Sequence, residues 1–213
     1  SSTPHGGGLG IFAAFALGLA LYAAQTHAFD SQLMPVLFAT FILVIIGWVD
    51  DLSALSVAMR FSIYTALSVA VVIWILMGSE SDGKVWLMPF AILFLLWMLN
   101  LYNFMDGIDG LAATQCFLAG ACAALLVFVA DGPGTYAAVC FMLALAHLGF
   151  LFFNWPPARL FMGDAGSVPT GFLLGALALY GQVNELLPLA CWLILLAAFI
   201  ADATYTLLRR LFT

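Results

Sequence analysis

Runs of apolar residues long enough to cross a lipid bilayer follow one another along almost the whole chain. A membrane-spanning helix needs about 20 such residues, with a range of about 17–25. Barrel strands would instead alternate apolar and polar residues, and these runs do not. We therefore predict an all-α fold, a polytopic transmembrane helical bundle that forms a single domain over residues 1–213. We expect eight spans, of which the seventh is short and rich in glycine: 8–25, 34–49, 61–77, 85–101, 111–130, 137–153, 168–181 and 187–207.

The composition excludes a soluble fold. Of the 213 residues, 65% are hydrophobic and only 8% are charged, whereas a soluble domain carries roughly a quarter charged residues. The bilayer is therefore an expected partner. The chain has only five basic residues, too few to form a basic surface that binds nucleic acid. The four cysteines lie in apolar runs without a CxxC pair, and the three histidines are isolated, so we expect neither disulfides nor zinc.

The basic residues indicate which side of the membrane each connection faces. Eight spans would place the connections 50–60, 102–110 and 154–167 on the same side as both termini. Four arginines, at positions 60, 159, 209 and 210, fall on that side, whereas the other side receives only the lysine at position 84. Because basic residues collect in cytoplasmic loops, we predict that this face is cytoplasmic.

Three acidic clusters fall on this predicted cytoplasmic face. The first is Asp50-Asp51, the second contains Asp106 and Asp109, and the third contains Asp164. Each of these aspartates alone could simply cap a helix. If the clusters converge, however, two carboxylates about 4 Å apart repel by about 4 kcal/mol at an effective dielectric near 20. A divalent cation would offset that repulsion, and carboxylate oxygens suit Mg²⁺ or Mn²⁺.

The second cluster also carries amides and glycines. Asn100, Asn103 and Asp106 are spaced three residues apart, which places them on one side of a helix end. Gly107 and Gly110 would let the backbone approach a ligand closely. Amide and carboxylate groups beside such a backbone suit a nucleobase or a sugar.

Taken in order, these clusters resemble the polyprenyl-phosphate N-acetylhexosamine-1-phosphate transferases, also called glycosyltransferase family 4. The most specific strings are Asn-x-x-Asn-x-x-Asp-Gly-Ile-Asp-Gly-Leu, from Asn100, and Phe-Met-Gly-Asp-x-Gly-Ser, from Phe161. The resemblance extends from Thr3 to Arg210, essentially the whole chain. The family also includes the phospho-MurNAc-pentapeptide translocase, but the Pro-His-Gly-Gly-Gly form near the N-terminus favours the type that initiates O-antigen or common antigen.

The resemblance implies a reaction and its partners. Such enzymes transfer a sugar 1-phosphate from a UDP-sugar donor to an undecaprenyl phosphate acceptor, with Mg²⁺ or Mn²⁺ as cofactor, and release UMP. They start the synthesis of cell-envelope polysaccharides, lipopolysaccharide among them, at the cytoplasmic face of the bacterial inner membrane. A homodimer is compatible with this resemblance.

The resemblance also implies catalytic roles for five residues. Asp164 would be the metal ligand. Asp50 and Asp51 would bind or deprotonate the lipid phosphate and help at the metal. Asn103 and Asp106 would line the catalytic cleft.

Five further residues match positions that bind uridine in the family. Phe161 would stack on the uracil base. The others are Gly107, Ile108, Asp109 and Asn154.

Two departures from the family concern its ends. Further spans before the glycine-rich segment, and a histidine-containing loop after Arg210, have no counterpart here. We therefore expect a catalytic domain truncated at both ends, with little transferase activity of its own.

Two other functions stay open from the residues alone. A cation-coupled transporter would place its acids near mid-membrane, whereas these aspartates lie at the ends of the spans. A Mg²⁺-dependent aromatic prenyltransferase would use paired DxxxD-type motifs, and the residues after Asp50-Asp51 supply no acid at that offset.

Overall fold

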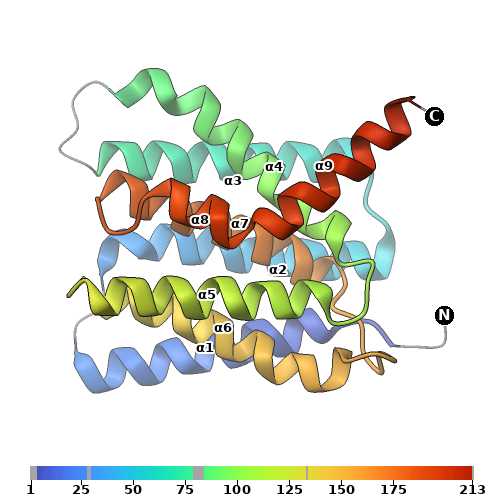
Figure 1. The fold of residues 1–213 in the computed structure, drawn as a ribbon, viewed down its shortest axis with the longest axis horizontal. Helices are drawn as coiled ribbons and strands as arrows, with labels where there is room; N and C mark the ends of the chain where they lie inside the picture. The colour runs from blue at the N-terminus through green and yellow to red at the C-terminus, as the bar shows by residue number, and fades with distance from the viewer. Residues whose placement is uncertain (1–3, 28–29, 79–83, 133, 213) are drawn as a thin grey trace.

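The computed structural model describes residues 4–27, 30–78, 84–132 and 134–212, and helices make up most of these ranges (Figure 1). A single isolated parallel bridge, between His5 and Phe161, is the only β pairing among them. Two short 3₁₀ turns, η1 (Ser31–Leu33) and η2 (Lys84–Leu87), precede the second and fourth helices. The α-helices are α1 (Gly7–Thr26), α2 (Met34–Ser53), α3 (Val57–Met77), α4 (Met88–Met105), α5 (Leu111–Val129), α6 (Gly134–Asn154), α7 (Asp164–Val183), α8 (Leu189–Leu195) and α9 (Ala197–Phe212).

Local sequence signals set several helix boundaries. Pro35 and Pro89 lie in the first turns of α2 and α4, where a missing backbone N–H removes no helical hydrogen bond. The Ser56 hydroxyl accepts a hydrogen bond from the Met59 N–H and caps α3. Proline and side-chain caps thus divide a nearly continuous apolar sequence into separate helices.

The expected helical bundle is confirmed, but the expected number of spans is too high. Within the described ranges, six helices, α1 to α6, are long and apolar enough to cross a membrane. A seventh span arises only if α8 and α9 count as one helix bent by 66°. The remaining expected span, 168–181, falls within α7.

Helix α7 differs from the other long helices because protein surrounds it. It packs against α1, α2 and α4, and every residue from 165 to 178 is buried. A helix enclosed by other helices need not be as apolar as lipid, so α7 can carry glycines and polar groups. A Cβ on Gly171 would lie 2.5 Å from the Met98 carbonyl oxygen, which shows how closely α7 and α4 approach each other.

The three acidic clusters lie at one end of the bundle, as predicted. The α2–α3, α4–α5 and α6–α7 connections gather at the right of Figure 1, together with the start of α1 and the end of α9. Helices α2 and α4 continue further toward this end than the predicted spans, to Ser53 and Met105. Asp50, Asp51 and Asn103 therefore project from the last turns of helices, which fixes their directions more firmly than a loop would.

Candidate active site

The site is built around the first turn of α7, where the Phe-Met-Gly-Asp-x-Gly-Ser string lies. Gly163 precedes the helix with a φ of 73°, which a residue with a side chain rarely adopts. A Cβ on Gly163 would also lie 2.6 Å from Asp51 Oδ2. Asp164 is the first residue of the helix. The glycine thus lets the chain turn into α7 while a carboxylate from α2 lies directly against it.

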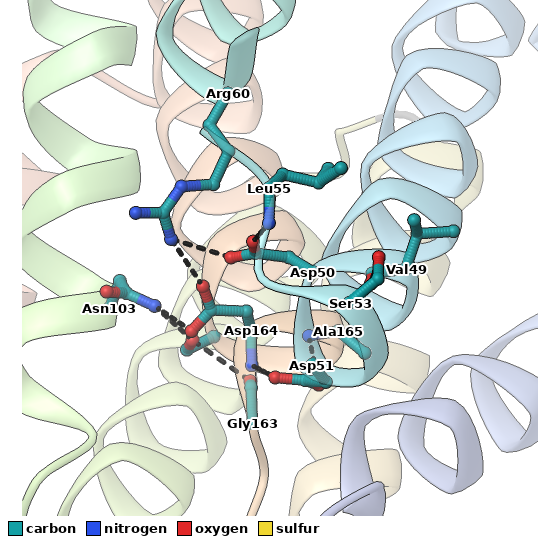
Figure 2. A network of polar contacts seen from close by, with 11 residues as sticks. Val49, Asp50, Asp51, Ser53, Leu55, Arg60, Asn103, Gly163, Asp164 and Ala165 are labelled. Carbon is teal, nitrogen blue, oxygen red and sulfur yellow. Dashed lines mark hydrogen bonds and ion pairs between the residues drawn. The ribbon is translucent and has the colours of Figure 1, made fainter. Parts of the chain in front are cut away.

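Asp51 binds the backbone at the start of α7. Its Oδ1 accepts a hydrogen bond from the Asp164 N–H at 3.0 Å, and its Oδ2 accepts one from the Ala165 N–H at 3.2 Å. Figure 2 shows this contact beneath the Asp164 side chain. The last turn of α2 is thereby joined to the first turn of α7.

Asp50 points to a different set of partners from its neighbour. Its Oδ1 accepts a hydrogen bond from the Leu55 N–H at 2.6 Å. Its Oδ2 lies 2.6 Å from Arg60 Nη1, which also lies 3.3 Å from Asp164 Oδ2 (Figure 2). Arg60 therefore bridges two carboxylates that come from α2 and α7. The two adjacent aspartates therefore have different partners.

Asn103 approaches Asp164 from α4. Its Nδ2 donates hydrogen bonds to Asp164 Oδ1 at 2.8 Å and to Ser167 Oγ at 3.0 Å. The Ser167 hydroxyl in turn donates to the Gly163 carbonyl oxygen at 3.1 Å. Both oxygens of Asp164 thus have a donor from another helix, which holds its carboxylate in one orientation.

Asp106 lies beside this network, and no cationic side chain among the described residues forms an ion pair with it. Burial, together with the nearby carboxylates of Asp164 and Asp51, raises the pKa of Asp106 to about 7, although a hydrogen bond from the Gly163 N–H partly opposes the rise. A carboxyl group whose pKa lies near 7 loses its proton readily when a positive charge binds close to it.

A cleft of about 140 Å³ opens beside Asp164. Polar groups of Arg60, Asn100 and Asn103 line one part of it, and the hydroxyl of Tyr64, also in its lining, is buried without a hydrogen-bond partner. The rest of the lining is apolar: Val57, Phe61, Leu99 and Val168. The cleft therefore combines a polar region beside the carboxylates with apolar walls contributed by α3, α4 and α7.

The donor groups at this end fit a hard divalent cation in part. Over the described ranges, no three acidic, histidine or cysteine side chains are grouped closely enough to hold a metal by themselves. Magnesium, however, is usually held by one or two carboxylates together with substrate phosphates and water. Asp164, whose side chain is 26% exposed, and the nearby Asp106 supply such a pair of oxygen donors. The residues therefore fit a cation that shares its ligands with a phosphate-bearing substrate.

The residues predicted to bind uridine lie on the α4–α5 and α6–α7 connections and at the end of α6, and hydrogen bonds join these segments. Asn154 Oδ1 accepts a hydrogen bond from the Gly110 N–H at 2.9 Å, and its Nδ2 donates to the Leu160 carbonyl oxygen at 3.0 Å. Asp109 Oδ2 accepts a hydrogen bond from the Ala158 N–H at 2.9 Å. Asp109 and Asn154 therefore hold the α4–α5 connection against the α6–α7 connection.

Three more of these predicted residues border the same region. Ile108 is 59% exposed, and a Cβ on Gly107 would meet only the Phe104 carbonyl oxygen, at 3.9 Å. Phe161 pairs with the N-terminal segment, because its N–H donates to the Pro4 carbonyl oxygen and its carbonyl accepts from the Gly7 N–H. The His5 ring lies against Phe161 with 5.3 Å between ring centres. Gly107 and Ile108 are thus accessible on the α4–α5 connection, and the aromatic ring of Phe161 lies on the α6–α7 connection against the N-terminal segment.

Sequence reasoning missed two residues of the network, Arg60 and Ser167. Arg60 had been counted only toward the charge bias of the loops. One signal was available: a charged residue in the first turn of an apolar helix needs a partner, and Asp50 lies ten residues earlier on the preceding helix. The partnership of Ser167 with Asn103 has no comparable signal, because it depends on how α4 packs against α7.

Comparisons with known proteins point to one family. The family model described as "Glycosyl transferase family 4" matches residues 33–182. A probable undecaprenyl-phosphate N-acetylglucosaminyl 1-phosphate transferase of Bacillus subtilis is 27% identical over 219 residues, which cover 98% of this chain and 60% of the relative. A phospho-N-acetylmuramoyl-pentapeptide-transferase of Desulforapulum autotrophicum is 38% identical over 120 residues, covering 50% of this chain and 33% of the relative.

A third relative extends the match along the chain. The phospho-N-acetylmuramoyl-pentapeptide-transferase of Gluconacetobacter diazotrophicus is 32% identical over 216 residues, covering 84% of this chain and 59% of the relative. The chain therefore spans 60% or less of the length of these three relatives.

Proposed function

The chain belongs to glycosyl transferase family 4, and from that premise we propose that the protein transfers a sugar 1-phosphate from a UDP-sugar to undecaprenyl phosphate. The sugar is of the N-acetylhexosamine type, and the products are a lipid-linked sugar diphosphate and UMP. The reaction starts the synthesis of a cell-envelope polysaccharide. It takes place in the bacterial inner membrane, with the active site facing the cytoplasm.

The observation that carries this proposal is the convergence of Asp50, Arg60, Asn103 and Asp164 from four helices beside one cleft. A guanidinium next to a carboxylate suits a phosphate that arrives with a proton to lose. In the proposed reaction Arg60 binds the acceptor phosphate, and Asp50, whose carboxylate pairs with Arg60, accepts its proton. The apolar walls of the cleft support a lipid chain attached to that phosphate.

Asp164 and Asp106 would hold the divalent cation, Mg²⁺ or Mn²⁺. When bound, such a cation neutralises the diphosphate of the donor and stabilises the UMP that leaves. Asn103 keeps the Asp164 carboxylate oriented toward the cleft through its hydrogen bond. An oxygen of the acceptor phosphate forms a bond to the sugar-linked phosphorus, and the bond from that phosphorus to UMP breaks.

The uridine of the donor would lie over the two joined connections. Phe161 presents an aromatic ring for stacking on uracil, and Gly107 and Ile108 leave space for the approach of the nucleoside. In this proposal Asp109 and Asn154 act by shaping the uridine pocket, since each already hydrogen-bonds the opposite connection.

An assay of UMP release tests the proposal. The full-length protein in nanodiscs receives UDP-N-acetylglucosamine, undecaprenyl phosphate and Mg²⁺, and each component is withheld in turn. We expect release of UMP only when all three are present. Release of diphosphate from a prenyl diphosphate, or cation-driven uptake of a solute without UMP release, would instead support the prenyltransferase or the transporter and overturn the proposal.

A further inference from the structure

We propose that Asp51 is a positioning residue, which caps the N-terminus of α7 from α2 and thereby holds Asp164 in place, and that it neither transfers a proton nor binds the cation. The proposal separates the two adjacent aspartates: Asp50 faces the reacting groups, and Asp51 supports the helix that carries Asp164. The role given to Asp164 rests on the proposed function, whereas the cap itself does not.

The backbone hydrogen bonds at the start of α7 support this role. The first four N–H groups of any α-helix lack partners within the helix. Counted from Gly163, which caps the helix, the N–H groups of Asp164 and Ala165 donate to Asp51, that of Gly166 donates to the Gly163 carbonyl oxygen, and that of Gly163 itself donates to Asp106. All four groups are therefore satisfied, two of them by Asp51 alone. The start of α7 consequently offers no free N–H group to a phosphate.

The packing of α2 against α7 supports the role independently. Gly47 lies one helical turn before Asp51, and a Cβ there would lie 2.4 Å from the Asp164 carbonyl oxygen. Gly163 approaches Asp51 closely from the other helix, as its 2.6 Å spacing to Oδ2 shows. Two glycines and one carboxylate thus form a close contact that fixes the end of α2 on the start of α7.

The two aspartates also differ in what surrounds their oxygens. The side chain of Asp50 is only 7% exposed and faces the guanidinium of Arg60. Asp51 lies on the exposed surface of α2, yet both of its oxygens are engaged by backbone N–H groups. A side chain that caps a helix needs an acceptor oxygen within hydrogen-bond distance of the backbone N–H groups. A side chain that transfers a proton needs an ionisable group. Asparagine keeps one acceptor oxygen, enough for one of the two N–H groups, and has no ionisable group.

The test compares Asp51→Asn with Asp51→Ala in the full-length protein. Because asparagine can still accept one of the two N–H hydrogen bonds and is a good capping residue, we expect Asp51→Asn to keep turnover within about tenfold of wild type. Asp51→Ala frees two N–H groups and lets Asp164 move, so we expect turnover to fall by about 10²-fold or more. Asp50→Asn, at the neighbouring position, should lose activity as severely as an alanine there.

Two readouts separate positioning from chemistry. The first is Mn²⁺ alone, titrated by electron paramagnetic resonance: we expect Asp51→Asn to bind within about threefold of wild type, and Asp51→Ala about tenfold more weakly. The second is the dependence of turnover on pH, which should keep the wild-type shape in Asp51→Asn. Ser53→Ala is the matched control, because Ser53 is exposed on the same turn and donates only to the Val49 carbonyl oxygen.

A second variant covers the case in which Asp51→Ala does not fold. Gly163→Ala places a methyl group against Asp51 from the α7 side of the contact. It should lower Mn²⁺ affinity and turnover together, although the Asp51 carboxylate is still present. Equal loss in Asp51→Asn and Asp51→Ala at unchanged melting temperature would overturn the proposal, because the carboxylate itself would then be required. Full activity in Asp51→Ala would also overturn the proposal, because the cap would then not be needed.

Failure of the proposed function gives a different pattern. If wild type releases no UMP from any UDP-sugar, the transferase assignment fails, but the melting temperatures still test the cap. We then still expect Asp51→Ala to melt lower than Asp51→Asn. A melting temperature for Asp51→Ala equal to that of Asp51→Asn would overturn the cap whatever reaction the protein catalyses.

Discussion

The two ends of α7 use polar groups in different ways. At its C-terminal end the Tyr180 hydroxyl donates to Asp30 Oδ2 at 2.5 Å. The Tyr136 hydroxyl donates to the Leu177 carbonyl oxygen at 2.9 Å, and Trp192 Nε1 donates to that same hydroxyl. The carboxylate in this network is that of Asp30, and neutral donors satisfy it.

At the N-terminal end, by contrast, negative charge exceeds positive charge. Asp50, Asp51, Asp106 and Asp164 gather there, and among the described side chains around Asp164 only Arg60 is cationic. Both ends fix the helix, but a structural network needs no surplus of charge. The surplus at one end, beside a cleft, indicates a site that receives a cation, or a phosphate that arrives together with one.

The largest effect should come from removing the charge of Asp164. We expect Asp164→Asn to lower turnover by about 10³-fold or more, comparable with the loss of a principal electrostatic group in an active site, and to weaken Mn²⁺ binding. The matched change at the other end is Tyr180→Phe, which should keep turnover and lower stability by about 1 kcal/mol. UMP release and thermal unfolding of both variants measure this contrast. Comparable loss of turnover in the two variants would show that the ends do not differ in function.

Removing Arg60 should have the next largest effect. Arg60→Met leaves Asp50 and Asp164 facing each other, so we expect turnover to fall by about 10²-fold, since arginines that stabilise phosphate charge contribute at least this much. Stability should fall by about 2–3 kcal/mol, less than for a fully buried pair, because the Arg60 side chain is 31% exposed. Mn²⁺ should bind more tightly than to wild type, since a competing positive charge is gone. Weaker Mn²⁺ binding would mean that Arg60 organises the cation site.

A smaller effect is expected where the site meets the donor. Phe161→Ala should weaken UMP binding by about 1–2 kcal/mol, the usual contribution of one aromatic ring stacked on a base. Affinity for undecaprenyl phosphate should hardly change. His5→Ala, which removes the ring packed against Phe161, is the control. Equal loss of both substrates, measured by calorimetry, would mean that Phe161 supports the fold and does not stack on uracil.

The sequence predicted this charged end well, because charge is rare in the chain. The gathering of Asp50, Asp106 and Asp164 followed from counting spans between clusters, although the span count itself was too high. The count included residues 168–181, but these lie in α7, whose glycines and polar groups make it less apolar than the six candidate spans. Hydropathy identifies helices that face lipid, but it does not identify a helix that is enclosed by other helices. The position of α7 in the fold therefore depends on packing.

The partners of individual residues could not be predicted in the same way. Whether Asp51 meets a substrate or the backbone of α7 depends on the approach of α2 to α7, which Gly47 allows. The tie between Asn154 and Gly110 likewise joins two connections 44 residues apart. Such contacts follow from tertiary geometry, and a single sequence contains no periodic signal for them.

The smallest expected effect concerns Asp106 and depends on pH. Because burial raises the pKa of Asp106 to about 7, above its ordinary value of 3.8, the folded protein holds this proton more tightly than the unfolded chain does. Its contribution to stability is therefore fully present below about pH 4 and is lost as the pH rises through about 7.

Asp106→Asn removes that dependence, since a neutral amide resembles the protonated acid in shape. We expect the variant and wild type to unfold at similar temperatures near pH 4. At pH 8 the variant should be more stable by about 1 kcal/mol, which corresponds to about 2–4 °C for a chain of this size. Unfolding scans in the absence of divalent cations, at closely spaced pH values, measure the difference. A constant offset between the two proteins at every pH would contradict the prediction, because the substitution would then act through packing and not through the ionisation of Asp106.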